Sequence, residues 1–353
     1  MSVSSVRPSV SIVIPTYNEE ENIEAIVGGF LASKYDNIVE ILVVDGESTD
    51  STADKVLELS RLYSKVKLLH NPHKIQSSAL NIGLEACQGE IFLRADAHCR
   101  YAPDYVEKCV DTLLKTQAIN VGGAQRFVAE SKFQAGVALA ANSILGNGGA
   151  KYRNPQYNGY VDTVFLGCMW TETLINIQGY SNQITNEDAE LNQRLLAQDK
   201  QAIYVSSDIK VWYYPRSTWI SLYVQYFKYG RGRFLTATKH TKNLQLRGKL
   251  PFLFLSCIII LFCLDIFLPG VSLHSEKLIF VGIIAVLAES LRVNLQFNDS
   301  FIKEVWRGSD KNPPSLLSRW LSCAIVIMTL PVAHFSGYAY QLFRHKICRI
   351  SDW

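Results

Sequence analysis

Short β-branched segments alternate with helical segments in the N-terminal part of this chain, and this alternation restricts its possible folds more than any other feature. Pro15 ends the first segment, and Asn18 with the acidic residues after it is expected to cap and open a helix through about Leu31. Asp45 ends the second segment, and Ser48-Thr49-Asp50 is expected to open a further helix. Strands are predicted over Val10–Ile14, Val39–Val44, Val66–His70 and Glu90–Leu93. Strands and helices that alternate at such short spacing predict an open, doubly wound α/β sheet.

Polar residues follow three of these strands at the points where the strands end. In such sheets, ligands bind beyond the carboxyl ends of the strands. Turn chemistry alone would explain any one of these groups, because Pro, Asn, Asp and Gly are common loop residues. Three groups in register, each with a carboxylate, favour a ligand site instead. Its candidate residues are Pro15, Thr16, Tyr17, Asn18 and Glu19 after the first strand, Asp45 after the second, and Asp96 and His98 after the fourth.

The chain lacks the glycine-rich sequences that bind phosphate through backbone amides. Neither G-x-G-x-x-G nor G-x-x-x-x-G-K-[ST] occurs, so dehydrogenase and P-loop functions lose their main support. A divalent cation on carboxylate oxygens is then the simplest way to neutralise a phosphate. Asp96 is the candidate metal ligand, and Asp45 can accept hydrogen bonds from a base or a ribose. His98 can add an imidazole ligand, which Mn²⁺ tolerates better than Mg²⁺, or it can be structural.

Four segments, in this order, resemble one known catalytic domain: SIVIPTYNEEENI, VVDGESTDST, NIGLEACQGEIFLRADAH and NEDAELNQRL. They resemble the family 2 glycosyltransferases with the GT-A fold, and within that family the membrane-associated sugar transferases of bacterial exopolysaccharide assembly, including the succinoglycan glucosyltransferase type. The resemblance extends from Val10 to about Arg233, and it implies that Asp188 is the general base. The residues implied to bind a nucleotide sugar, usually a uridine diphosphate sugar, are Pro15, Asn18, Glu19, Asp45 and Asp96. The family's commoner metal motif ends in Asp where this chain has His98, which leaves the second metal ligand open.

Glu187 and Asp188 are the candidate catalytic residues. They directly precede a helical pattern over Ala189–Ala197, so they are expected at a helix N-terminus, where the helix dipole favours ionised Asp188. Simple helix capping is the alternative. A carboxylate can remove the proton of an acceptor hydroxyl, while a metal stabilises the leaving diphosphate. One base without a second, nucleophilic carboxylate implies a single displacement, and therefore inversion at the anomeric carbon.

Lys228 and Arg231 lie in a segment that partly matches a motif of processive family members. Those members carry Gln-x-x-Arg-Trp, and this chain has Gln225-Tyr226-Phe227-Lys228-Tyr229. Both cations are candidates to pair with the pyrophosphate. An amphipathic interfacial helix is the alternative, because apolar residues recur there at helical spacing: Trp219, Leu222, Tyr223, Tyr226 and Phe227.

A basic segment precedes the first long apolar run. No Asp or Glu occurs between Asp208 and Asp265. This pattern is typical of a cytoplasmic juxtamembrane segment that faces anionic lipid, and a solvated basic loop is the alternative. The basic residues are Lys228, Arg231, Arg233, Lys239, Lys242, Arg247 and Lys249.

Three apolar segments follow. Leu250–Leu273 is long enough to cross a hydrocarbon core of ~30 Å. Leu278–Ala288 is shorter, so its ability to span is left open. Ser322–Phe343 contains Pro331 and has basic residues on both flanks, which favours a broken or re-entrant segment over a simple span.

Three further features of the sequence indicate the cellular compartment and the binding partners of the protein. The net charge of +3 is too small to indicate nucleic acid by itself. The eight cysteines show no C-x-x-C pair, so reduced thiols are expected rather than a zinc site. The N-terminal residues lack the basic start and apolar core of a secretory signal, so the catalytic region is expected in the cytosol.

The sequence therefore predicts a GT-A catalytic domain, a doubly wound mixed sheet, over residues 1–235. A small α-helical membrane domain over 236–353 would carry the basic segment and two or three hydrophobic segments. The expected function is inverting, Mn²⁺- or Mg²⁺-dependent hexosyl transfer from a nucleotide sugar to a lipid-linked saccharide acceptor. The expected place is the cytosolic face of the inner membrane, as a multi-pass protein in contact with membrane lipid. Alternatives are transfer to polyprenyl phosphate itself and a catalytically inactive, membrane-anchored binding protein.

Overall fold

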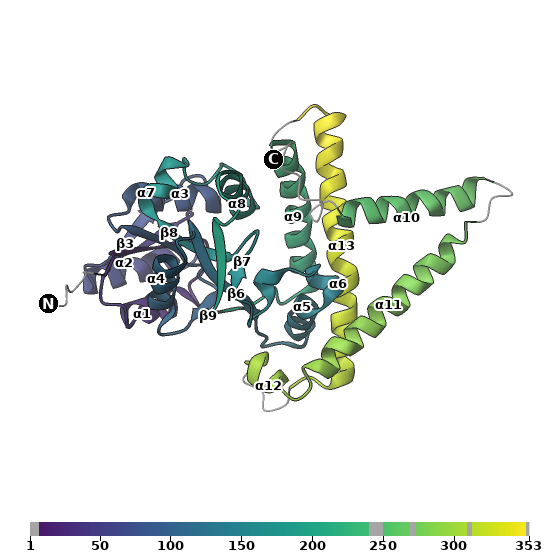
Figure 1. Cartoon of the computed structure of the whole chain (residues 1–353), viewed down its shortest axis with the longest axis horizontal. Coiled ribbons are helices and arrows are strands. Elements are labelled where there is room, and N and C mark those ends of the chain that lie inside the picture. Colours follow the sequence, from purple (N-terminus) through teal and green to yellow (C-terminus); the bar gives the residue numbers. More distant parts are fainter. Residues whose placement is uncertain (1–6, 240–249, 269–272, 309–312, 351–352) are drawn as a thin grey trace. The chain divides into compact units, whose positions relative to one another are not determined.

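The chain divides into two compact units in the computed structural model, which describes residues 7–239, 250–268, 273–308, 313–350 and 353 (Figure 1). The first unit contains the chain up to Arg126 together with Asn154–Tyr213. The second unit contains Phe127–Arg153 and the chain from Tyr214 onward. The predicted domains, 1–235 and 236–353, stay predictions.

A mixed β-sheet forms the centre of the first unit. Over the described residues it has nine strands, in the order β3-β2-β1-β4-β8-β6-β9-β5, with β7 paired to β9. The first four neighbours are parallel, whereas β8 runs antiparallel to β4 and β6. The strands are β1 Val10–Thr16, β2 Ile38–Asp45, β3 Val66–His70, β4 Ile91–Arg94, β5 Cys99–Tyr101, β6 Asn120–Phe127, β7 Gly159–Tyr160, β8 Phe165–Trp170 and β9 Ile203–Tyr213.

The four strands predicted from sequence are confirmed as β1 to β4, and the predicted mixed α/β sheet is confirmed with them. Helices cover the sheet, as the left part of Figure 1 shows. The helices of the first unit are α1 Ile23–Leu31, α2 Thr52–Leu62, α3 Gln76–Ala86, α4 Tyr105–Thr116, α7 Thr171–Asn176 and α8 Glu187–Gln198.

The β-branched composition of β1 explains its place at the centre of the core. Val10, Ile12, Val13 and Ile14 are fully buried, as expected of a strand that is covered on both faces. Helix α3 approaches β1 closely at Gly83, where an added Cβ would lie 2.3 Å from a methyl carbon of Val13. A side chain at this position would push α3 away from the strand.

Helix α1 differs from its prediction. Asn18 and the acidic residues after it were expected to cap and open this helix, but the helix begins at Ile23 with Asn22 as its N-cap. Asn18 instead has a left-handed backbone, with φ of 54°, and belongs to the loop that follows β1. Its hydrogen-bonding partners lie in the loop after β2, and this tertiary contact overrides the local capping preference.

Helices make up most of the second unit. Helix α13 packs against α5, α9, α10 and α11. Glycines permit its close approach to α9: an added Cβ on Gly337 would lie 1.9 Å from the Phe227 carbonyl oxygen. The α-helices are α5 Lys132–Asn142, α6 Ile144–Asn147, α9 Trp219–Lys239, α10 Leu250–Phe267, α11 Ser275–Gln296, α12 Phe301–Glu304 and α13 Leu316–Lys346.

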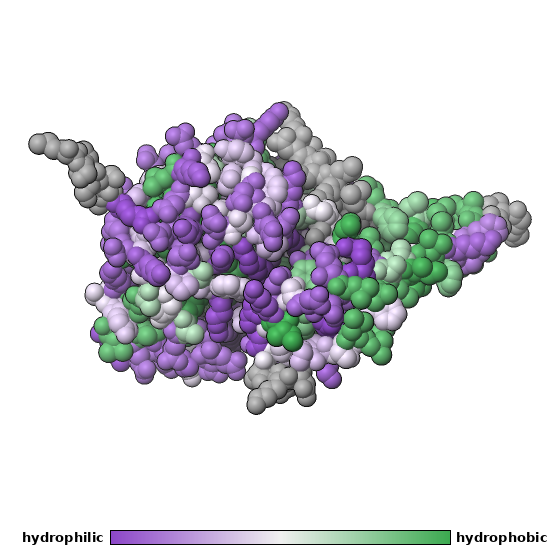
Figure 2. All heavy atoms as spheres, turned by 60° about the horizontal axis from the view of Figure 1, so that its bottom comes forward, coloured by the Kyte–Doolittle hydropathy of each residue, from purple (hydrophilic) through white to green (hydrophobic). Residues whose placement is uncertain are grey.

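Two described helices, α11 and α13, are long and apolar enough to cross a membrane by length and composition. Helix α10 is a shorter apolar helix, and residues 269–272 of the predicted first span lie outside the described residues. Figure 2 shows apolar residues gathered over the region of α10 and α11. Exposed side chains there include Phe254, Ile260, Phe267, Phe280 and Val281.

The predicted break of the helix at Pro331 is wrong, because α13 continues through this residue. A proline inside a helix removes one backbone donor and bends the helix, but packing on neighbouring helices can outweigh this cost. Residues on both sides of Pro331 are buried, among them Leu330 and Ala333.

Candidate active site

The carboxyl ends of β1, β2 and β4 lie at one edge of the sheet, because these strands are parallel neighbours. Thr16, the last residue of β1, pairs with Asp45, the last residue of β2. Val13 of β1 pairs with Arg94, the last residue of β4, and Asp96 follows in the next loop. The structure therefore brings the three predicted groups of polar residues to the same edge.

Asp45 and Thr16 are buried where their strands end, whereas the adjacent Tyr17 is exposed and Pro15 is partly buried. The two Asp45 carboxylate oxygens accept hydrogen bonds from Ser48, from its backbone nitrogen at 3.0 Å and from its hydroxyl at 2.5 Å. A carboxylate has about four acceptor positions. Asp45 therefore retains capacity to accept further hydrogen bonds from a ligand.

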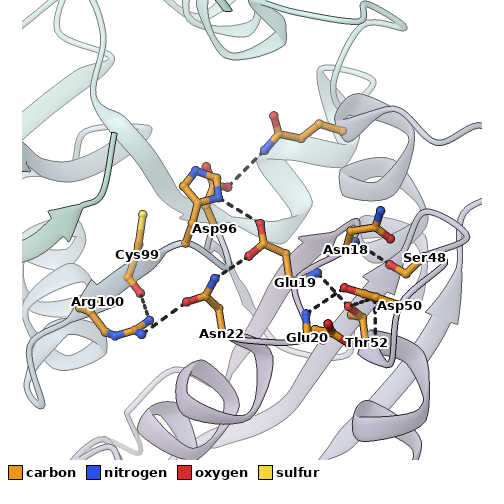
Figure 3. Close-up of polar contacts among 12 residues, drawn as sticks. Asn18, Glu19, Glu20, Asn22, Ser48, Asp50, Thr52, Asp96, Cys99 and Arg100 are labelled. Atoms are coloured by element: carbon orange, nitrogen blue, oxygen red, sulfur yellow. Dashed lines mark hydrogen bonds and ion pairs between the residues drawn. The ribbon is translucent and has the colours of Figure 1, made fainter. Parts of the chain in front are cut away.

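Asn18 joins the loops that follow β1 and β2. Its backbone nitrogen donates to the Ser48 hydroxyl at 2.8 Å (Figure 3), and its side-chain oxygen accepts from the Thr49 backbone nitrogen at 2.8 Å. Asn tolerates the left-handed backbone found here better than most residues. Asn18 thus fixes the two loops that border the site.

Glu19 holds His98 across the same edge. One Glu19 carboxylate oxygen lies 3.3 Å from His98 Nδ1, and the other accepts from the Asn22 side-chain amide at 3.0 Å. Figure 3 shows Glu19 between Asn22 and the loop that carries Asp96. When neutral His98 donates from Nδ1, its Nε2 keeps a lone pair, and a carboxylate often orients a metal-binding histidine in this way.

Arg94 connects the two carboxylate clusters that the sequence separates. Its Nε donates to Asp96 Oδ1 at 3.1 Å, and its Nη1 donates to Glu187 Oε1 at 3.1 Å. Arg94, Asp96 and Glu187 are 6%, 7% and 4% exposed, so all three charges are shielded from solvent. Burial works against the guanidinium charge, but Asp96 and Glu187 outweigh it and raise the Arg94 pKa well above its usual value.

Sequence reasoning missed Arg94. The available signal was the position of Arg94: it is the last residue of an otherwise apolar strand, Ile91–Arg94, and lies directly before the Asp96 loop. A cation in a buried strand needs partners, because an isolated buried charge is very costly. The sequence did not reveal which second carboxylate Arg94 binds.

Glu187 and Asp188 open α8, as predicted, but their surroundings differ. Glu187 is buried, and its burial raises its pKa to about 7; Arg94 opposes this rise and Asp188 adds to it. Asp188 is half-buried, and its Oδ1 accepts from the Ala189 backbone nitrogen at 2.7 Å. Of the two carboxylates, Asp188 is the more accessible to a substrate.

Asp96 and His98 are the residues to test as metal ligands. Among the described residues, no group of three or more His, Cys, Asp or Glu side chains could hold a metal. Asp96 Oδ1 also accepts from Gln76 at 3.3 Å, whereas the contact of Oδ2 with Arg94 Nη2 is long, at 3.5 Å. One carboxylate oxygen and one imidazole suit Mg²⁺ or Mn²⁺ when phosphate oxygens and water complete the coordination.

Lys228 and Arg231 belong to α9 in the second unit. Arg231 Nε donates to the Gln341 side-chain oxygen at 2.9 Å, and its guanidinium lies over the Trp353 ring, 4.0 Å from the centroid. Lys228 is exposed. Their predicted role in pyrophosphate binding stays a prediction.

Comparison with known proteins identifies the family. Residues 11–171 match the family model described as glycosyl transferase family 2. The succinoglycan biosynthesis protein ExoA of Rhizobium meliloti (strain 1021) is 36% identical over 243 residues, which cover 68% of this chain and 73% of that protein. The chain belongs to glycosyltransferase family 2. The predicted family is therefore confirmed, and the protein is a glycosyltransferase.

Two further relatives extend the comparison. A dolichyl N-acetyl-alpha-D-glucosaminyl phosphate 3-beta-D-2,3-diacetamido-2,3-dideoxy-beta-D-glucuronosyltransferase of Methanococcus voltae is 27% identical over 80% of this chain and 87% of its own length. Among solved structures, the mannosyltransferase PcManGT from Pyrobaculum calidifontis, in complex with GDP-Man and Mn²⁺, is similar with a TM-score of 0.60. That likeness covers 97% of this chain and 89% of the mannosyltransferase at 16% identity, and it supports the glycosyltransferase fold alone.

Proposed function

We propose that this family 2 glycosyltransferase transfers a sugar from a nucleoside diphosphate sugar to a lipid-linked saccharide, with inversion at the anomeric carbon. The donor that we propose to test first is a uridine diphosphate sugar, and the metal is Mn²⁺ or Mg²⁺. The synthesis of an exopolysaccharide or another cell-surface glycan is the proposed context. The observation that carries the proposal is the buried Arg94 bridge, because it joins Asp96 to the start of the helix that carries Asp188.

The proposed chemistry divides the work between two carboxylates. Asp188 removes the proton of the acceptor hydroxyl, because it is the more accessible carboxylate at the start of α8. Asp96 and His98 would hold the divalent cation, which would stabilise negative charge on the leaving diphosphate. With Glu187 buried against Arg94, Asp188 acts as a base without a nucleophilic partner, and a single displacement inverts the anomeric configuration.

Donor binding is assigned to the loops after β1 and β2. Asp45 retains acceptor capacity for a base or ribose, and Tyr17 offers an exposed ring beside it. Asn18 and Glu19 keep these loops in place through their contacts with Ser48 and His98. The backbone of Pro15 and Thr16 completes this border of the donor site.

A lipid-linked acceptor suits a chain with candidate membrane helices. Helices α11 and α13 have the length and composition to span a membrane, and the Methanococcus relative is named for a dolichyl-linked sugar phosphate acceptor. We propose a multi-pass protein whose catalytic unit faces the cytosol. Lys228 and Arg231 of α9 are the cations proposed to meet phosphate, either of the donor or of the acceptor lipid.

The test is a transfer assay with the full chain in detergent micelles. It combines uridine and guanosine diphosphate sugars with Mn²⁺, Mg²⁺ or chelator, and it offers a lipid-linked saccharide, polyprenyl phosphate and a lipid-free saccharide as acceptors. Transfer to the lipid-linked saccharide, lost with chelator, is expected, and proton NMR of the product should show an inverted anomeric centre. Transfer to polyprenyl phosphate alone would replace the proposed acceptor. No transfer from any donor would leave the inactive binding protein as the better account.

A further inference from the structure

We propose that Arg94 is a positioning residue that couples the donor site to the base, with Glu187 as its anchor on α8 rather than as a catalytic group. The inference rests on the proposed function of the same site. It assigns roles to two residues: Arg94, which is absent from the sequence-based site, and Glu187, whose predicted catalytic role it replaces.

The geometry uses both ends of one planar guanidinium. On the β4 side, Arg94 Nε lies 3.1 Å from Asp96 Oδ1 and Nη2 lies 3.5 Å from Oδ2. On the α8 side, Nη1 lies 3.1 Å from Glu187 Oε1. Guanidinium donors have a fixed fork geometry, so the position of one carboxylate constrains the position of the other.

This constraint reaches the base because Glu187 is the first residue of α8 and Asp188 the second. The N-cap, Asn186, has a left-handed backbone with φ of 60°, which sets the direction in which the helix begins. Arg94 then ties this first residue to the end of β4. The bridge therefore constrains the separation between Asp96 and Asp188.

The charge balance explains why the bridge leaves a cation site. Arg94 supplies one positive charge to the two carboxylates of Asp96 and Glu187, so the buried group carries excess negative charge when both are ionised. The Arg94 contact with Asp96 Oδ2 is long, and this oxygen is available to a divalent cation. Without Arg94, two buried carboxylates would lack their shared partner, and breaking a buried pair is strongly destabilising.

Two pairs of variants separate positioning from acid–base chemistry. Glu187→Gln keeps an oxygen that can accept from Arg94, so kcat should stay within about 3-fold of wild type, whereas Glu187→Ala should lower it about 10-fold or more. Both should bind UDP with Mn²⁺ almost as wild type does. Arg94→Met should weaken that binding and also lower kcat, and Arg94→Lys should recover only part, because a single ammonium cannot reproduce the fork.

A double variant tests the coupling directly. If Glu187 acts through Arg94, then Arg94→Met combined with Glu187→Ala should transfer no more slowly than Arg94→Met alone. The matched control is Arg194→Met on the same helix, where Arg194 pairs with Glu190 away from the β4 end. It should lower Tm and leave kcat unchanged. Additive losses, or equal losses in Glu187→Gln and Glu187→Ala, would overturn the proposal.

Hydrogen–deuterium exchange keeps this test independent of the proposed reaction. Amides in the first turns of α8, such as that of Glu190, which donates to the Asn186 carbonyl at 3.0 Å, should exchange faster in Arg94→Met and in Glu187→Ala but not in Glu187→Gln. Unchanged exchange in both disruptive variants would overturn the positioning role. A wild-type protein that transfers no sugar would defeat the proposed function, while the exchange result would still decide whether Arg94 anchors α8.

Discussion

Two buried glutamates lie at opposite edges of the same sheet, and their pKa values are shifted in opposite directions. Glu40 lies near the amino ends of the parallel strands, and Glu187 lies near their carboxyl ends, at the start of α8. Glu40 is 1% exposed and Glu187 is 4% exposed. Both side chains are shielded from solvent, but Glu187 lies deeper than Glu40, so the two carboxylates differ in desolvation as well as in their partners.

Glu40 has three hydrogen-bond donors. Its carboxylate accepts from the Ser11 hydroxyl at 2.7 Å, the Gln88 backbone nitrogen at 2.6 Å and the Lys67 ammonium at 2.7 Å. Burial acts to raise its pKa, but Lys67 and Ser11 outweigh burial, and the Glu40 pKa is lowered. This carboxylate is stable as an anion without any ligand.

Glu187 shares its one cation with Asp96, and Asp188 follows it directly in the chain. Its pKa is raised to about 7 because burial and Asp188 together exceed the effect of Arg94. Perturbed pKa values of this kind cluster at functional sites. The amino-end network, which is Glu40 with Ser11, Lys67 and Gln88, therefore supports stability. The carboxyl-end network, which is Arg94 with Asp96 and Glu187, is the one suited to chemistry.

The largest effect that we expect concerns Asp188. Asp188→Asn keeps the shape of the side chain and removes the proton acceptor, so kcat should fall about 10²- to 10⁴-fold. Donor affinity and Tm should change little, because a half-buried residue with a local hydrogen bond contributes little to either. Steady-state kinetics with calorimetric donor binding measures both quantities. A kcat within a few-fold of wild type would mean that another residue is the base.

The next effect concerns the metal. Asp96→Ala removes the proposed carboxylate ligand and should weaken Mn²⁺-dependent UDP binding about 10²-fold. His98→Asp should retain binding and move the preference from Mn²⁺ toward Mg²⁺, because Mg²⁺ prefers oxygen ligands. Calorimetry with each metal and with chelator measures the change. Equal UDP affinity in wild type and Asp96→Ala would contradict the assigned ligand.

The sequence predicted the parts of the molecule that depend on local patterns. Two strands were found because β-branched runs ended at Pro15 and at Asp45, and two as short apolar runs between helical segments; the candidate site followed because parallel strands end at one edge. The Arg94 bridge to Glu187 could not be predicted, because it depends on the tertiary fold, which brings the start of α8 to the end of β4 across 93 residues of sequence. The start of α1 was misplaced for a similar reason: Asn18 binds a loop that lies distant in sequence.

A third prediction concerns the amino-end network and should affect stability without affecting catalysis. Glu40→Gln replaces an acceptor oxygen by a donor NH₂ among three donors, so one buried hydrogen bond is lost at a cost of about 1–3 kcal/mol. Chemical denaturation should show this loss, and kcat of the folded protein should stay unchanged. Glu58→Gln, on the exposed face of α2, is the control and should stay within about 0.5 kcal/mol of wild type. A fall in kcat that matches the stability loss would mean that the two edges of the sheet are not independent.

The smallest expected effect is a difference in pH dependence between the two glutamates, measured as Tm without added metal. The Glu40 pKa is lowered in the folded state, so its contribution to stability is present above the unfolded value of about 4.3 and is lost as the pH falls below it. The Glu187 pKa is raised to about 7, so its contribution is present below about pH 4.3 and is lost as the pH rises through about 7. Relative to wild type, Glu187→Gln should therefore flatten the Tm profile between about pH 4.3 and 7, and Glu40→Gln should flatten it only at lower pH. If both variants changed the same pH range in the same direction, the two carboxylates would have equivalent surroundings, and the division between a stabilising edge and a reactive edge would fail.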